Sequence, residues 1–222
     1  ALAADQIGPG IAGQVKALSF DPSDLTGNTI VAGGDNCGVY KTTDYGDSWV
    51  PWNDGLDAPG TNMAWYIDDL IVIKGSVAGS QVPKANQGTY AATHGGIYFR
   101  HSDFTEWQWQ TDPVVDARYK YQGGSSDAHA RTSECAVPFS CFAFDASTGK
   151  LYAGTGNGGL NQGDELWNDY YPESGSTDPQ YSVWVLDLSQ SSDQWRPLHR
   201  VGNIGAVRQM SMVDYGGSPR LF

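Results

Sequence analysis

The stretch Gly33–Trp52 reads GGDNCGVYKTTDYGDSWVPW, and the interpretation of the whole chain starts from it. It opens with a glycine-rich turn at 33–36 and continues with a short strand expected over 38–42. A second polar turn then leads into another strand expected over 49–52. Upstream, two further short strands are expected over 15–20 and 29–32, each followed by a turn. Residues 15–52 therefore predict four short antiparallel strands joined by tight turns.

Part of this stretch follows the pattern S/T-x-D-x-G-x-S/T-W through Thr42, Asp44, Gly46, Ser48 and Trp49. The pattern resembles the Asp-box of BNR-repeat β-propellers, such as sialidases, xyloglucanase-type glycoside hydrolases and sortilin-like proteins. This resemblance implies an all-β propeller of four-stranded antiparallel blades. It also implies structural roles: the aspartate accepts backbone N–H groups, the glycine takes a positive φ, and the tryptophan packs between sheets. We expect no metal ion at the turn; a calcium ion there is the alternative.

The same succession of strands and turns recurs along the chain, which is typical of a repeat architecture. We expect blades at about 15–55, 64–110 and 139–200, and the start of a fourth at 204–222. The hairpins His101–Trp107 and Asp187–Trp195 resemble Asp-boxes that have lost part of the pattern. About three and a half blades make an incomplete ring, so we expect the remaining blades to come from a longer polypeptide or a partner chain.

Charge and composition narrow the class of partner. The 222 residues contain 25 acidic and 13 basic side chains, a net charge of −12. This balance argues against nucleic acid or an anionic membrane surface as a partner, because both need a cationic face. No apolar run approaches the ~20 residues that a membrane-spanning helix needs. The opening Ala1–Ala4 fits the end of a signal-peptide cleavage site, so we expect a secreted protein, extracellular or periplasmic.

Three cysteines leave two interpretations open. Cys135 and Cys141 lie six residues apart and could form a disulfide in an oxidising compartment. The alternative is that these two and Cys37 are buried free thiols. The spacing matches no zinc site and no haem-attachment motif, so we expect no cofactor.

The repeat alignment brings three polar residues to matching turns of three blades: Asp35, His94 and Asn157. Polar side chains that converge on the opening of a propeller often build a ligand site. The alternative is that aspartate, histidine and asparagine before glycine simply form turns.

Two long segments on the same expected face, 111–138 and 160–181, are rich in aromatic and acidic side chains. Rings among carboxylates suit carbohydrate binding, and they equally suit a protein–protein surface. The aromatic candidates for binding are Tyr119, Tyr121, Trp167, Tyr170 and Tyr171.

A closer resemblance covers Ala32–Leu56, which is similar to the first blade of xyloglucanase-type glycoside hydrolases down to Pro51, Asn53 and Asp54. In that family an aspartate at the position of Asp35 is the catalytic base, paired with an acid from a second propeller. The sequence therefore leaves two readings. The first is a non-catalytic binding or assembly module; the second is a fragment of an extracellular, inverting glycoside hydrolase with Asp35 as general base.

Overall fold

The computed structural model describes residues 14–35, 37–56, 62–79, 81–110, 139–155, 183–191, 193–198 and 207–222. These residues form three four-stranded antiparallel sheets and a two-stranded hairpin. The first sheet contains β1 (Val15–Phe20), β2 (Ile30–Gly34), β3 (Gly38–Thr42) and β4 (Val50–Pro51). The second contains β5 (Ile67–Ile73), β6 (Gly88–Thr93), β7 (Gly96–His101) and β8 (Gln108–Trp109). The third contains β9 (Phe139–Asp145), β10 (Lys150–Thr155), β11 (Val183–Asp187) and β12 (Arg196–Pro197), and the hairpin joins β13 (Met212–Tyr215) to β14 (Ser218–Leu221).

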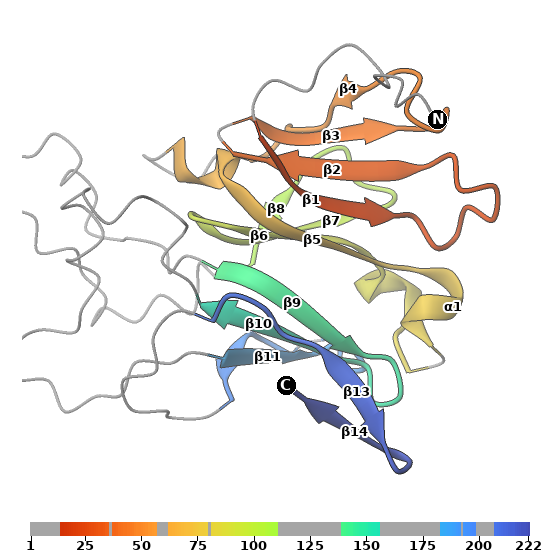
Figure 1. The fold of residues 1–222 in the computed structure, drawn as a ribbon, viewed down its shortest axis with the longest axis vertical. Helices are drawn as coiled ribbons and strands as arrows, with labels where there is room; N and C mark the ends of the chain where they lie inside the picture. The colour runs from red at the N-terminus through yellow and green to blue at the C-terminus, as the bar shows by residue number, and fades with distance from the viewer. Residues whose placement is uncertain are drawn as a thin grey trace, which may run out of the picture.

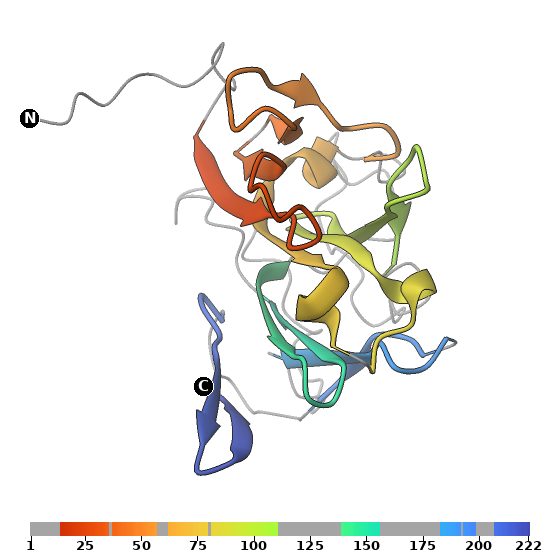
Figure 2. The ribbon, with the colours of Figure 1, turned by 90° about the vertical axis from the view of Figure 1, so that its right-hand side faces the viewer.

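Each sheet follows the simple order of its strands in the chain, which confirms the predicted propeller blades. The blades lie one above another in Figure 1. The short helix η1 (Asn62–Trp65) lies between the first and second blades, whereas α1 (Gly75–Ala78) and η2 (Lys84–Asn86) lie between β5 and β6 of the second blade. Seen along the strands, the first strands of the blades lie toward one side of the molecule and the last strands toward the other (Figure 2). The described residues thus form part of a propeller ring, with β1, β5, β9 and β13 innermost.

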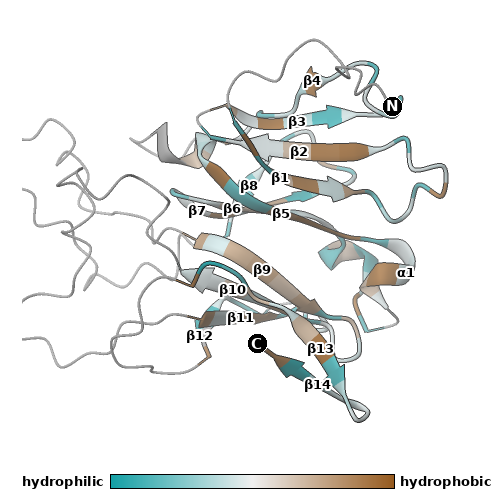
Figure 3. Ribbon diagram, in the orientation of Figure 1, coloured by the Kyte–Doolittle hydropathy of each residue, from teal (hydrophilic) through white to brown (hydrophobic). Residues whose placement is uncertain are grey.

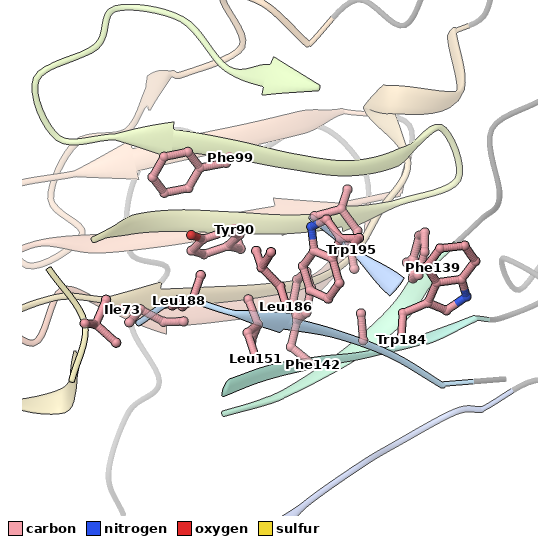
Figure 4. Packing of buried hydrophobic residues seen from close by; sticks show 14 of the residues in the cluster. Ile73, Tyr90, Phe99, Phe139, Phe142, Leu151, Trp184, Leu186, Leu188 and Trp195 are labelled. Atoms are coloured by element: carbon pink, nitrogen blue, oxygen red, sulfur yellow. The ribbon is translucent and has the colours of Figure 1, made fainter. Parts of the chain in front are cut away.

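Apolar side chains hold neighbouring blades together. One buried cluster joins the first and second blades and includes Val31, Val39, Leu70 and Val72. A larger one joins the second and third blades, where rings and aliphatic groups from both sheets interdigitate (Figure 4). In Figure 3 apolar colour runs along most of β2 and along β9, whereas the end of β13 and part of β14 are hydrophilic. Burial of this kind contributes about 25 cal/mol for each Å² of apolar surface.

The Asp-box of the first blade is a hydrogen-bonded turn. Asp44 Oδ1 accepts the Thr42 hydroxyl at 2.6 Å and the Ser48 N–H at 2.9 Å, and Asp44 Oδ2 accepts the Ser48 hydroxyl at 2.5 Å. Gly46 has a φ of 98°, the positive value expected for it. Trp49 is only half-buried, and Trp52 is the tryptophan of this hairpin that packs against the core.

The later blades keep this turn but change the residue that closes it. At the end of β3 the Thr42 hydroxyl accepts the N–H two residues ahead. At the end of β7 the acceptor of the equivalent N–H, that of Asp103, is His101 Nδ1. At the end of β11 the N–H of Ser189 is accepted by Asp187 Oδ1. The tryptophans that follow, Trp107 and Trp195, are both buried. The hairpin therefore survives the loss of the sequence pattern because any side-chain acceptor at that position can close the turn.

Part of the fourth unit expected at 204–222 is a hairpin. Its first strand, β13, begins at Met212, and its second, β14, begins at Ser218. Gly216 and Gly217 both have positive φ and form the tight turn between the two strands. Backbone hydrogen bonds between Ser211 and Phe222 close the other end of the hairpin.

Candidate functional site

The first strand of each of the three four-stranded blades contains one extra residue at an equivalent position. In β1, Val15 and Ala17 pair with consecutive residues of β2, so Lys16 is a β-bulge. Asp68 is the corresponding extra residue in β5, and Ser140 is the one in β9. A bulge bends the strand and redirects a side chain, and bulges are common beside functional sites. Here they bring a lysine, an aspartate and a serine to the same end of three neighbouring blades.

The first two bulges meet in a row of charged and polar groups. The Lys16 ammonium lies 3.0 Å from Asp68 Oδ1 and 3.6 Å from Asp35 Oδ1. On its other side, Asp68 Oδ2 lies 2.9 Å from His94 Nε2. The row Asp35–Lys16–Asp68–His94 therefore crosses from the first blade to the second, and we call it the charged row.

Exposure to solvent separates the members of the charged row. The Asp35 side chain is 38% exposed and that of Lys16 22%, whereas the figures are 11% for Asp68 and 0% for His94. Burial by itself raises the pKa of Asp68, but His94 and Lys16 outweigh it and hold that pKa below its ordinary value. Asp35 and Lys16 are thus the groups that a ligand can reach, and Asp68 with His94 holds them in position.

Burial bears on the predicted binding role of His94, which stays a prediction. Asp35 and His94 do occupy matching positions, because each follows a second strand and donates its N–H to the residue just before the first strand, Gln14 or Tyr66. The Asp35 side chain is half-exposed. The His94 ring, in contrast, stacks on the Tyr66 ring, with the ring centroids 4.9 Å apart, and is buried. His94 is therefore placed to support Asp68.

An exposed aromatic residue lies one position before a residue that contacts the charged row. Trp65, at the end of η1, is 40% exposed and directly precedes Tyr66, whose ring covers His94. Trp65, Lys16 and Asp68 were not among the residues selected from the sequence, because no motif or repeat position distinguishes them there.

The charged row and the Asp-box lie at opposite ends of the first blade. Asp35 directly follows β2 and lies ahead of β3, whereas Asp44 follows β3. The charged row lies at the end of the blades where β9 and β11 begin and β10 ends (Figure 1).

Several predicted site residues lie outside the described residues: Asn157, Trp167, Tyr170, Tyr171, Tyr119 and Tyr121. Their roles stay predictions. Cys135 also lies outside them, while Cys141 and Cys37 are buried thiols. The pairing of Cys135 with Cys141 therefore stays a prediction as well.

Among the described residues, the charged row offers hydrogen-bonding groups to a ligand. An inverting glycosidase needs a carboxylate base and a second carboxyl group that stays protonated. Asp68 does not fit the second role, because its neighbours stabilise the anion. Asp69 has a pKa raised by burial to about 6, but its carboxyl group lies between the second and third blades, where both of its oxygens accept backbone N–H groups, one of them from Phe142. The Asp35 carboxylate can accept hydrogen bonds from hydroxyl groups, and the Lys16 ammonium can donate hydrogen bonds to them.

Within the described ranges, no three histidine, cysteine, aspartate or glutamate side chains come together in a way that could hold a metal ion.

Among the same residues, no helix has the length and apolar character required to cross a membrane.

Comparison with known proteins identifies the fold. No family model and no curated protein matches the sequence. The structure is similar to the crystal structure of an ancestral GH74 enzyme, with a TM-score of 0.52 and 19% identity over 95% of this chain. It also matches a protein of unknown function from Bacteroides thetaiotaomicron, with a TM-score of 0.47 and 14% identity over 92% of this chain and 44% of that one. This chain spans 22% of the length of the ancestral GH74 enzyme. The chain is thus an all-β, partial β-propeller with the fold of part of a GH74 enzyme.

Proposed function

We propose that this chain is part of a secreted Asp-box β-propeller that binds carbohydrate, without cleaving it, at the charged row. The observation that carries the proposal is the half-exposed Asp35 carboxylate, held beside the Lys16 ammonium at the end of the first blade. A carboxylate and an ammonium side by side offer the acceptors and donors that sugar hydroxyls require.

Trp65 supplies the second element of a sugar site. Carbohydrate sites combine hydrogen-bonding groups with an aromatic face, and the exposed Trp65 directly precedes Tyr66, which stacks on His94. Asp68 adds rigidity, because it fixes the Lys16 ammonium at 3.0 Å and is itself held by His94. A site whose polar groups are already fixed loses little entropy when a ligand binds.

Binding to soluble polysaccharides tests this proposal. Affinity electrophoresis with xyloglucan, mixed-linkage glucan and a neutral bacterial exopolysaccharide should reveal retardation by at least one of them. We expect Asp35→Ala and Trp65→Ala each to weaken that binding at least tenfold. Asp103→Ala is the matched control, since its carboxylate is 83% exposed and belongs to the hairpin that follows β7. If Asp35→Ala and Trp65→Ala were retarded as strongly as the control Asp103→Ala, the proposed site would be refuted.

The alternative is a glycoside hydrolase in which Asp35 is the general base. The fold shared with an ancestral GH74 enzyme and the partial exposure of Asp35 favour it. It requires a general acid supplied by residues beyond the charged row. Release of reducing sugar by the unaltered protein, abolished in Asp35→Asn, would replace the binding proposal with the catalytic one.

The remaining blades belong to the same proposal. The chain corresponds to only part of a propeller, so further blades from a longer polypeptide or a partner chain would complete the ring. A polysaccharide is the ligand we propose for the charged row; another surface protein is the competing partner.

A further inference from the structure

The charges of the charged row do not cancel. Its ions are the two carboxylates of Asp35 and Asp68 and the ammonium of Lys16. Burial raises the pKa of Asp68, but hydrogen bonds from His94 and Lys16 outweigh it, so Asp68 is an anion at neutral pH. The His94 imidazole adds a positive charge only when it is protonated. With a neutral imidazole, two carboxylates and one ammonium leave one negative charge in excess.

This excess charge lies at Asp35. The Lys16 ammonium donates a hydrogen bond to Asp68 Oδ1 at 3.0 Å, whereas its 3.6 Å separation from Asp35 Oδ1 exceeds hydrogen-bond distance. His94 also lies against Asp68, with Nε2 2.9 Å from Oδ2. Among the residues that the structure describes, no group donates a hydrogen bond to the Asp35 carboxylate. The 38% exposed side chain of Asp35 therefore keeps its acceptor oxygens open to the donors of a ligand.

Other cations in the described part of the chain are held elsewhere. The Lys74 ammonium lies 2.9 Å from Asp21 Oδ2, where β1 and β5 end, and the Arg100 guanidinium lies over the Trp52 ring, 4.3 Å from its centroid. The whole sequence has a net charge of −12. A field of one sign attracts ligands of the opposite sign and repels those of the same sign. The local excess at Asp35 and the charge of the whole chain thus favour the same kind of ligand.

Three kinds of sugar substituent differ in what they offer to Asp35. A hydroxyl group can donate one hydrogen bond, whereas a primary ammonium has three donors and the opposite charge. An ionised carboxylate has no donor. It can pair with Lys16 only by lying beside Asp35, because the Lys16 ammonium lies between two carboxylates. Ammonium groups are therefore favoured most at this place, and carboxylates least.

We propose that the charged row selects its ligand by charge and that its preferred ligand is a polysaccharide bearing primary ammonium groups. A neutral polysaccharide binds more weakly at the same place, and a polyuronate binds more weakly still. The inference rests on the proposed carbohydrate-binding function and adds the substrate class to it. Asp35 is the residue that determines this specificity.

One polysaccharide in three forms tests the proposal. In mixed-linkage glucan of matched length, carbon 6 of the glucose units bears the native hydroxyl, a primary ammonium or a carboxylate. Titration calorimetry at about pH 7 compares the three forms at about 0.15 M salt, where charges more than about 8 Å apart are largely screened. Asp35→Asn removes the charge and keeps the size of the side chain. Asp103→Asn is the matched control, because it removes an 83% exposed carboxylate from the hairpin that follows β7.

We expect the wild type and Asp103→Asn to bind the ammonium form at least about threefold more tightly than the hydroxyl form, as an exposed ion pair provides. The carboxylate form should bind more weakly than either. In Asp35→Asn the ratio of the first two affinities should fall to near one. Lys16→Gln gives an independent comparison: it should increase the preference for the ammonium form, because it removes the only ammonium of the charged row.

Equal affinity of the wild type for the ammonium and hydroxyl forms would overturn the inference and leave the proposed function standing. A preference as large in Asp35→Asn as in Asp103→Asn would also overturn it, because the general charge of the chain would then be its origin. Tightest binding of the carboxylate form, or a preference for ammonium that decreases in Lys16→Gln, would likewise contradict it. Absence of binding by all three forms would overturn the proposed function as well.

Discussion

Asp69 makes the stability of this fold depend on pH. Its carboxylate lies between the first strands of the second and third blades, where Oδ2 accepts the Phe142 N–H at 2.7 Å and Oδ1 accepts the Leu70 N–H at 2.8 Å. Burial raises the pKa of Asp69 to about 6; the two hydrogen bonds oppose this rise, and the Asp68 carboxylate adds to it. Asp69 therefore holds a proton more firmly in the folded chain than in the unfolded one.

The size and sign of the effect follow from this pKa. Stability contributed by protonated Asp69 is fully present below the ordinary value of 3.8 and is lost as the pH rises through about 6. The whole difference corresponds to about 3 kcal/mol, at about 1.4 kcal/mol for each pH unit. Asp69→Asn keeps the shape of the protonated side chain and removes its titration. We expect the free energy of unfolding of Asp69→Asn, relative to wild type, to increase by about 2 kcal/mol between about pH 4 and pH 7.

Urea unfolding followed by tryptophan fluorescence, repeated at intervals across this pH range, measures the difference. Comparison of the variant with wild type cancels the titration of the other carboxylates. Asp103→Asn is the control, because its 83% exposed side chain lies away from the blade contacts. A relative stability of Asp69→Asn that is constant with pH, or that decreases as pH rises, would refute the assignment of a buried, proton-retaining carboxyl group.

Three other substitutions test the fold. Asp44→Ala should lower the Tm at pH 7 and have much less effect near pH 2, because hydrogen bonds hold the pKa of Asp44 at about 2 and its contribution is lost as pH falls through that value. Gly38→Ala should cost about 1–3 kcal/mol in urea unfolding, since Gly38 has a φ of 72° and an added Cβ would collide with the Asn53 side chain; Gly216→Ala, at a φ of 63° in open space, is the control and should cost less. Trp107→Ala should cost about 3–5 kcal/mol by the same measurement, because the ring is buried between the first two blades.

The sequence was sufficient to predict the blades because each is built from contacts that are local in the chain. Tight turns, short β-rich segments and the Asp-box repeat within about fifty residues, so the pattern exposes the architecture. The structure confirms the antiparallel order in each described sheet. The boundaries of the fourth unit were less predictable, because its first strand begins only at Met212, after residues whose pattern also suits a strand.

The charged row was only partly predictable, for a physical reason. Asp35 could be selected from its turn and from a resemblance, but Lys16 and Asp68 are 52 residues apart and meet only through blade packing. A bulge is a property of the register between two strands, and register depends on which residues are buried. His94 shows the converse: its position in the repeat was predicted correctly, while its burial depends on Tyr66 from another turn.

The two ends of the blades therefore respond differently to changes in sequence. At the Asp-box end, each hairpin closes its own turn, so Thr42 can give way to His101 or Asp187 while the sheet remains. At the other end, the charged row needs residues from two blades, and replacing either Lys16 or Asp68 removes one of the two partners of the other. The repeat signature identifies how each blade folds, but the bulges decide what adjoining blades can hold between them. The chemistry of this propeller is therefore to be sought at Lys16 and Asp35 and not in the Asp-box that reveals its fold.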